Sequence, residues 1–422
     1  MNIMQADSPS LIFSDAKGNI MDFEPLAMAG RTWDYIEPVE TDDLIPMPKG
    51  SQLYVLPDRN PIGFDQETGE LIVLEENPFE PGTPAYAVSI FLPAAYSQTH
   101  IAAWRKNNRA CDLPLFPYSA VGWHGESFVA AGVRVDDSRR QDPEMFNHEI
   151  IRTGITAWRK DLPENRLVKH LSNCALSYAC PAALNLFQGQ EEAPLPTSPA
   201  CNAACIGCIS LQEKSGPPSP QQRINFIPTP EEIAEVALKH IAAVDEPVVS
   251  FGQGCEGEPL LVADVIKKAI ILIRKSTSKG TINLNSNSSL PDKVAELADA
   301  GLDSLRISMN SPKEATYLKY FRPKYSFDAL TQSALEMKNR GKFVSLNLFV
   351  FPGLTDAPRE VSALKRFISE AGVDMIQWRN LNMDPDAYIE ALDLKLPPGM
   401  GVKNLIESLP LRKGYFNPYI PK

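Results

Sequence analysis

Three cysteines lie close together in the run CNAACIGCIS, which begins at Cys201. Three residues separate Cys201 from Cys205, and two separate Cys205 from Cys208. Thiolates on one short loop are typical ligands of a metal centre. A structural zinc site needs four closed ligands, and the run supplies neither a fourth cysteine nor a neighbouring histidine. A 4Fe–4S cluster held by three thiolates keeps one iron open to a further ligand, so the run favours such a cluster.

Two other interpretations of the cysteine run stay open. Free cysteine behaves as a small hydrophobe, so three incidental buried thiols are one alternative. Zinc with a distant fourth ligand is the other.

The N-terminus lacks the basic and apolar regions of a secretory signal, which predicts a cytoplasmic protein. In that reducing compartment, seven cysteines gathered mainly in the middle of the chain favour metal ligation over disulfides.

The elements that position the run are predicted to be β/α units, because strand and helix patterns alternate from about Thr229 onward. Thr229 and Glu232 form a capping box that predicts the first helix. The later helices are predicted at 262–275, 291–301, 327–341 and 358–372, and the strands at 246–252, 281–287, 302–310, 343–353 and 373–382. With a short opening strand at 194–200, the units predict an α/β fold, a partial (β/α)6 TIM-like barrel. An open doubly wound sheet has the same local pattern and stays an alternative.

Residues 1–190 differ from this pattern, since they are rich in proline and contain hairpin-like stretches at 53–76 and 125–135. They predict an N-terminal α+β domain of unknown role, which a helical segment at 165–187 closes. The predicted barrel covers 191–385, and 386–422 form a C-terminal tail.

The overall charge narrows the class of partner. A net charge of −11 and a pI near 5.1 repel phosphate backbones, so nucleic acid is an unlikely partner. No apolar run reaches the roughly 18 residues that a membrane span requires. We therefore expect a small-molecule or peptide substrate and no membrane.

The cysteine spacing resembles the CxxxCxxC signature of the radical S-adenosylmethionine (SAM) superfamily, and the resemblance covers about residues 195 to 385. The second strand ends in FGQGCEGEPLL, which is similar to the family's glycine-glycine-glutamate-proline segment that contacts the SAM amino group. Gly257 and Glu258 match this segment, while Glu256 replaces its first glycine. The resemblance therefore implies a 4Fe–4S cluster on the three cysteines and SAM near Gly257, Glu258 and, less directly, Glu256.

The same turn also contains Gly252, Gly254 and Gly257 at the spacing of a dinucleotide fingerprint. Pyrophosphate there would face Glu256 and Glu258, and the next strand ends without an acidic residue for the ribose. Dinucleotide binding is the weaker interpretation.

Polar residues alternate with apolar ones in the later strands. Arg306, Ser308 and Asn310 share one face of their strand, as do Ser345 and Asn347 of the next. A packed barrel interior is normally apolar, so this polar face suggests a bound ligand. The resemblance implies that the ligand is SAM, with Ser308 and Asn347 among its contacts; Asn285 is a further candidate. Alternatively, these side chains satisfy one another or line an open sheet edge.

The resemblance implies an enzyme in which the reduced cluster cleaves SAM into methionine and a 5′-deoxyadenosyl radical, which abstracts hydrogen from a substrate. A donor such as flavodoxin or ferredoxin would supply the electron. Which residue acts on the substrate is unknown. The alternative is a non-catalytic iron–sulfur electron-transfer or scaffold protein, although such a carrier would more naturally close all four iron sites.

The other cysteines are Cys111, Cys174, Cys180 and Cys255, enough in number for a second cluster. Joint ligation by Cys174 and Cys180 requires a helix break near Pro181, because residues six apart face different sides of a helix. We favour three buried structural thiols, with Cys255 near the first site.

Overall fold

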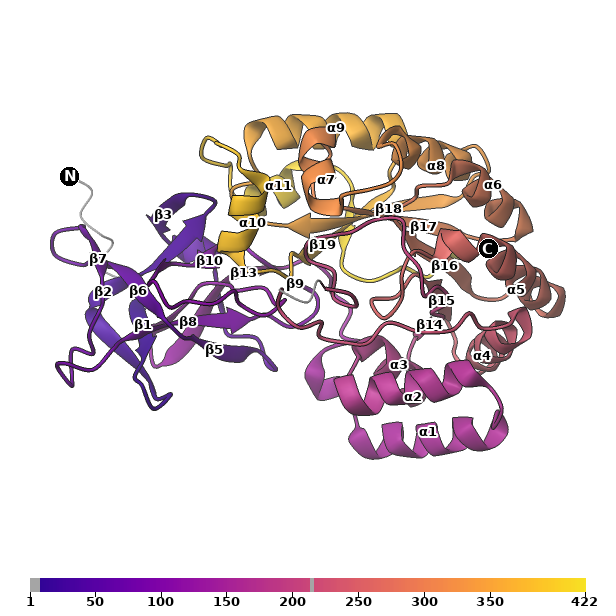
Figure 1. The fold of residues 1–422 in the computed structure, drawn as a ribbon, viewed down its shortest axis with the longest axis horizontal. Helices are drawn as coiled ribbons and strands as arrows, with labels where there is room; N and C mark the ends of the chain where they lie inside the picture. Colours follow the sequence, from indigo (N-terminus) through magenta and orange to yellow (C-terminus); the bar gives the residue numbers. More distant parts are fainter. Residues whose placement is uncertain (1–7, 213–215) are drawn as a thin grey trace. The chain divides into compact units, whose positions relative to one another are not determined.

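The computed structural model describes residues 8–212 and 216–422 (Figure 1). The chain forms two compact units. The first contains residues up to Val135 together with 349–362 and 378–410, and the second contains 136–348, 363–377 and 411–422.

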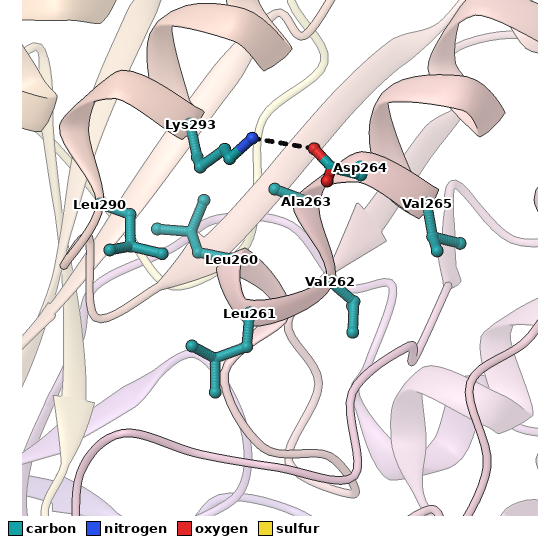
Figure 2. A pocket seen from close by; sticks show the side chains of 8 residues that line it. All are labelled: Leu260, Leu261, Val262, Ala263, Asp264, Val265, Leu290 and Lys293. Atoms are coloured by element: carbon teal, nitrogen blue, oxygen red, sulfur yellow. Dashed lines mark hydrogen bonds and ion pairs between the residues drawn. The ribbon is translucent and has the colours of Figure 1, made fainter.

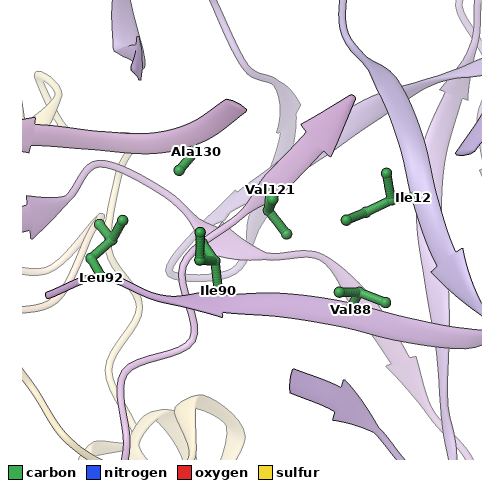
Figure 3. Packing of buried hydrophobic residues seen from close by; sticks show 6 residues of the cluster. All are labelled: Ile12, Val88, Ile90, Leu92, Val121 and Ala130. Atoms are coloured by element: carbon green, nitrogen blue, oxygen red, sulfur yellow. The ribbon is translucent and has the colours of Figure 1, made fainter. Parts of the chain in front are cut away.

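The first unit is built on antiparallel strands that pair into one sheet. The hairpins predicted from sequence are present, since β6 pairs with β7 and β12 with β13. Figure 3 shows an apolar cluster of this unit, in which Ile12, Ile90 and Val121 from three strands pack together. The strands are β1 Ser10–Ser14, β2 Ile20–Thr32, β3 Tyr35–Pro38, β4 Leu44–Pro46, β5 Gln52–Leu56, β6 Arg59–Asp65, β7 Leu71–Val73, β8 Tyr86–Phe91, β9 Tyr96–Gln98, β10 Ile101–Ala102, β11 Trp104–Lys106, β12 Val121–His124 and β13 Ser127–Arg134, and the helices η1 Thr41–Asp43, α10 Pro385–Leu392 and α11 Val402–Ser408.

The predicted α/β fold is confirmed by a sheet of parallel strands in the order β14-β15-β16-β17-β18-β19-β20, which forms a curled half-barrel. Helices α4, α5, α6 and α8 run along its outside (Figure 1). The strands are β14 Glu192–Pro194, β15 Val248–Phe251, β16 Thr281–Ser286, β17 Ser304–Met309, β18 Phe343–Val350, β19 Met375–Asn380 and β20 Arg412–Gly414, and the helices α4 Pro230–Ala243, η3 Pro259–Val262, α5 Ala263–Ser276, α6 Pro291–Ala300, α7 Glu314–Phe321, α8 Asp328–Lys338 and α9 Pro358–Ala371.

Two details of the predicted barrel were wrong. The described residues contain seven parallel strands, not six, because β20 pairs with β19. The opening strand lies at Glu192–Pro194, mostly upstream of the predicted 194–200. Pro196 and Pro199 lack a backbone N–H, so the segment that contains them cannot continue a ladder of hydrogen bonds.

A group of helices precedes the barrel in the second unit. The helical segment predicted at 165–187 breaks at Ala179, which adopts φ 47°. Pro181 then begins a new helix. None of the helices in the described ranges is long and apolar enough to cross a bilayer. The elements are η2 Pro143–Met145, α1 His148–Asp161, α2 Arg166–Tyr178 and α3 Pro181–Gln188.

Candidate functional site

The cysteine run lies on a long loop that leaves the carboxyl end of β14 and contains no helix or strand in its described residues. Its first part is attached to the turn after β15 by backbone hydrogen bonds. The N–H of Gly257 donates to the carbonyl oxygen of Ser198 (2.7 Å), and that of Glu258 to Ala200 (2.8 Å). The turn that was predicted to contact SAM therefore also fixes the residue immediately before Cys201.

The Glu256 side chain strengthens this attachment. Its buried carboxylate accepts hydrogen bonds from the backbone N–H groups of Thr197 (2.7 Å), Ser198 (2.9 Å) and Gln253 (2.7 Å). Burial raises the pKa of this carboxyl group, while the backbone donors oppose the rise. Both oxygens of Glu256 are thus engaged by the chain itself, which makes it an anchor of the cysteine loop.

The C-terminus of α7 holds the middle of the loop. The N–H of Ala204 donates to the carbonyl oxygen of Phe321 (3.0 Å), and that of Ile206 to Tyr320 (3.1 Å). The last carbonyl groups of a helix have no intrahelical partner, so they are available for this contact. Sequence reasoning missed α7, and the side chain of its N-cap, Lys313, makes no capping bond that would have marked its start.

All three thiols of the loop are partly buried. Burial raises the pKa of Cys201 and of Cys205, and the neighbouring thiols add to the rise. Metal ligation must therefore displace protons from these groups. The Nη2 atom of Arg223 lies 3.4 Å from the Cys208 sulfur, where a guanidinium can donate to a thiolate.

The spacing of the three sulfurs fits a cluster better than a single ion. Among the described residues, these thiols do not form a group with ligand atoms within 4.8 Å of one another. Around one tetrahedral zinc ion, sulfurs at about 2.3 Å from the metal lie roughly 3.8 Å apart. A cubane places each thiolate on a different iron, so it needs wider separations.

The turn glycines argue against dinucleotide binding. A Cβ on Gly252 would lie 1.7 Å from the Asn285 carbonyl oxygen, and one on Gly257 would lie 1.9 Å from that of Ala200. Gly254 approaches the side chains of Gln221 and Ile209. Each glycine therefore accommodates contact with the chain itself, not with a pyrophosphate.

Glu258 is buried at the N-terminus of η3. Its carboxylate accepts hydrogen bonds from the hydroxyl of Ser286 (2.5 Å) and from the N–H groups of Asn287 (2.9 Å) and Leu260 (3.0 Å). Burial raises the pKa of Glu258 to about 7, although these donors favour the ionised form. The side chain thus connects the ends of β15 and β16.

Asn285 belongs to a buried polar network on the inner face of the sheet. Its side-chain oxygen accepts from Asn283 (2.8 Å) and Asn417 (3.2 Å), and its amide donates to the Gly252 carbonyl oxygen (3.0 Å). Asn417 also donates to Glu192 (2.7 Å). The C-terminal segment therefore supplies a side chain to the interior, which sequence reasoning missed because no local pattern marks it.

Ser308 and Asn347 occupy paired positions on the adjacent strands β17 and β18. Both residues are half-buried. Among the described residues, no hydrogen-bond partner exists for the buried side-chain oxygen of Asn347. A buried polar atom without a partner costs free energy, so a ligand donor at this position would stabilise the fold. Asn347 therefore fits contact with a polar ligand, unlike Asn285, and Ser308 lies beside it in the sheet.

A surface pocket of about 360 Å³ lies at the start of α5 (Figure 2). It is lined by apolar side chains, with the ion pair between Lys293 and Asp264 (2.9 Å) on one side. None of its described lining residues is a predicted cluster or SAM ligand, so we do not assign the site to it.

Part of this chain is similar to known proteins. Residues 195–364 match the model of the Radical SAM superfamily. A GTP 3′,8-cyclase from Lactiplantibacillus plantarum is 28% identical over 162 residues, which are 37% of this chain and 44% of that protein. The match thus spans less than half the length of that curated relative.

Solved structures of other proteins show distant likenesses. The radical SAM methyltransferase TsrM from Kitasatospora setae is 14% identical, with 46% of this chain and 37% of that chain covered and a TM-score of 0.35. SuiB from Streptococcus suis, bound to the precursor peptide SuiA, is 16% identical, with 59% and 58% covered and a TM-score of 0.36. At TM-scores this low, we draw nothing from them.

The curled parallel sheet and the loop after its first strand define a β/α half-barrel that carries three free thiols on that loop. Within that class, residues 195–364 of this chain are similar to the radical SAM superfamily. This likeness supports the expectation that the domain uses a 4Fe–4S cluster and SAM.

Proposed function

We propose that this chain is a radical SAM enzyme whose cluster is held by Cys201, Cys205 and Cys208. The observation that carries the proposal is the anchored loop, which follows the first strand of a radical SAM domain. Its three sulfur atoms do not all lie within 4.8 Å of one another, so they are too far apart to bind one ion. When bound and reduced by one electron, the cluster would supply reductive cleavage of SAM into methionine and a 5′-deoxyadenosyl radical for hydrogen abstraction from the substrate. The protein contributes positioning and exclusion of water.

The SAM contacts proposed for this chain are of two kinds. Gly257 and Glu258 contribute through the turn after β15, and Ser308 and Asn347 through the inner face of the sheet. The unpartnered oxygen of Asn347 supports the second group. Chain donors already engage the side chains of Glu256, Glu258 and Asn285, so we propose that these three side chains support the contacts. Gly257 and Glu258 would then contact SAM through the backbone of the turn.

The substrate proposed is a small molecule or a peptide, and the electron comes from a donor such as flavodoxin or ferredoxin. The charge of −11 disfavours nucleic acid. A reducing cytoplasmic setting agrees with seven free cysteines in the structure. Residues 191–385 form the proposed radical SAM core, with 1–190 as an N-terminal domain of unknown role and 386–422 as the tail.

The proposal is tested by anaerobic reconstitution with iron and sulfide, followed by addition of SAM and dithionite. We expect release of 5′-deoxyadenosine and methionine, and no release from the Cys201→Ala/Cys205→Ala/Cys208→Ala variant. A reconstituted cluster that accepts electrons but never cleaves SAM would support the non-catalytic electron carrier instead.

A further inference from the structure

A second group of metal-ligating side chains lies outside the cysteine loop. Nε2 of His170 is 3.5 Å from the Cys174 sulfur and 3.5 Å from the Cys255 sulfur. The three ligand atoms all lie within 4.8 Å of one another. Both cysteines are buried, with exposed fractions of 1% and 4%.

Separate elements bring these residues together. His170 and Cys174 are four residues apart on α2, so they lie on the same face one turn apart. Cys255 comes from the turn after β15, where its carbonyl oxygen accepts a hydrogen bond from the Ile224 N–H (2.7 Å). Helix α2 therefore provides two ligands, and the turn after β15 adds the third.

The observed distances fit one tetrahedral ion. With a Zn–S bond of about 2.3 Å and a Zn–N bond of about 2.0–2.1 Å, tetrahedral angles place nitrogen and sulfur roughly 3.5–3.6 Å apart. The two measured separations between His170 and the sulfurs equal 3.5 Å. A second cubane would hold its ligands on different irons and farther apart, so this group does not fit a cluster.

We propose that His170, Cys174 and Cys255 bind a single zinc ion. Imidazole and thiolate ligands in tetrahedral geometry suit zinc. The burial of the two thiols suits a structural role, in which a fourth ligand closes the tetrahedron. Binding converts the two thiols to thiolates and releases their protons to solvent. The site is independent of the proposed enzymatic activity.

Zinc at this position connects α2 to the turn that anchors the cysteine loop. Cys255 directly precedes Glu256, whose carboxylate binds the N–H groups of Thr197 and Ser198. An ion held by Cys255 and the helix therefore limits movement of that turn. Its function would be to stabilise the cluster loop, not to act on substrate.

Metal analysis of the full-length chain without a histidine tag tests the site. We expect about one zinc per chain in the wild type, and the same content in the Cys201→Ser/Cys205→Ser/Cys208→Ser variant. Zinc should be lost from His170→Ala, Cys174→Ser and Cys255→Ser. Cys111→Ser is the matched control, because this exposed thiol is outside the group and its loss should leave zinc unchanged.

A second experiment uses only wild-type protein, so it tests the site even if a ligand variant does not fold. After removal of zinc by a chelator, Co²⁺ should bind with the spectrum of a tetrahedral thiolate site and be displaced by zinc. A wild type that binds neither ion, that binds iron with sulfide in the triple variant, or that forms a Cys174–Cys255 disulfide under reducing conditions would overturn the proposal.

Discussion

The carboxylate of Glu256 accepts a 2.7 Å hydrogen bond from the backbone N–H of Thr197. This contact joins the turn after β15 to the segment that leads into the cysteine loop. Because the carboxylate is buried, its donors have no alternative partner in water. The geometry of the three cysteines thus depends on a residue whose carboxylate binds the backbone of the chain itself.

Glu256→Gln is expected to loosen the loop. The amide replaces one acceptor oxygen by a donor, which leaves a buried backbone N–H unpaired at a cost of about 1–3 kcal/mol. We expect a lower free energy of unfolding in urea and less iron retained per chain during gel filtration. Glu246→Gln, at an exposed position, is the matched control and should change neither. Equal iron retention in the two variants would contradict the anchoring role.

Gly257→Ala tests the close approach of the turn to the loop. The added Cβ would lie 1.9 Å from the carbonyl oxygen of Ala200, so one backbone segment has to move. Such overpacking costs about 1–3 kcal/mol, and Cys201 follows directly in the displaced segment. We expect reduced iron content and weaker SAM binding by calorimetry. Gly341→Asn, where nothing lies within 4 Å and asparagine tolerates the positive φ, should leave both unchanged.

Local signals explain the part of the fold that the sequence predicted. Thr229 and Glu232 form the expected capping box through contacts three residues apart, and α4 begins there. By contrast, α7 has no side-chain cap, and its role arises from carbonyl groups that meet a loop more than a hundred residues away in the chain. Asn417 reaches the interior through a network of side chains from four other elements, and no periodicity encodes such contacts.

The candidate site shows the same division. The cysteine spacing is local and identified the loop, whereas the partners of Glu256 are fixed only when β14 and β15 pair. The sequence indicated Asn347 through period-two alternation and Asn285 as a further candidate, but it could not separate the two. The first is satisfied by the chain, and only the second has an unpartnered oxygen.

Asn347→Ala should separate ligand binding from stability. In the proposed SAM site the side-chain oxygen accepts a donor from the ligand, worth about 0.5–1.5 kcal/mol, so the dissociation constant should rise roughly 2- to 13-fold. Without ligand, the variant removes an unpartnered buried atom and should not lower stability. Asn285→Ala is the contrasting variant: it breaks three hydrogen bonds of the chain and should destabilise it. Affinity unchanged by Asn347→Ala would remove this residue from the site.

Glu258 makes stability depend on pH. Burial raises its pKa to about 7 from the ordinary value of 4.5. Between these values the unfolded chain releases a proton that the folded chain keeps, so the free energy of unfolding should fall as pH rises, by up to about 3 kcal/mol. Urea unfolding of cluster-free protein at pH 4.5 to 8 measures this fall. Glu258→Gln should flatten the profile over that interval, and an identical fall in the variant would assign the effect to other groups.

Of the remaining cysteines, Cys180 is the nearest in sequence to the proposed zinc ligands. Its N–H donates to the Cys174 carbonyl oxygen (3.1 Å), and it caps α3 after the break at Ala179. We expect it to complete the tetrahedron by side-chain rotation, since structural zinc sites close all four positions. Loss of a residue that only orients a metal ligand costs roughly 10- to 100-fold in metal affinity, so loss of a ligand in Cys180→Ser should weaken zinc binding by at least about tenfold. Competition with a chromophoric chelator measures the affinity, with Cys111→Ser as control. Unchanged affinity in Cys180→Ser would leave water, not Cys180, as the fourth ligand.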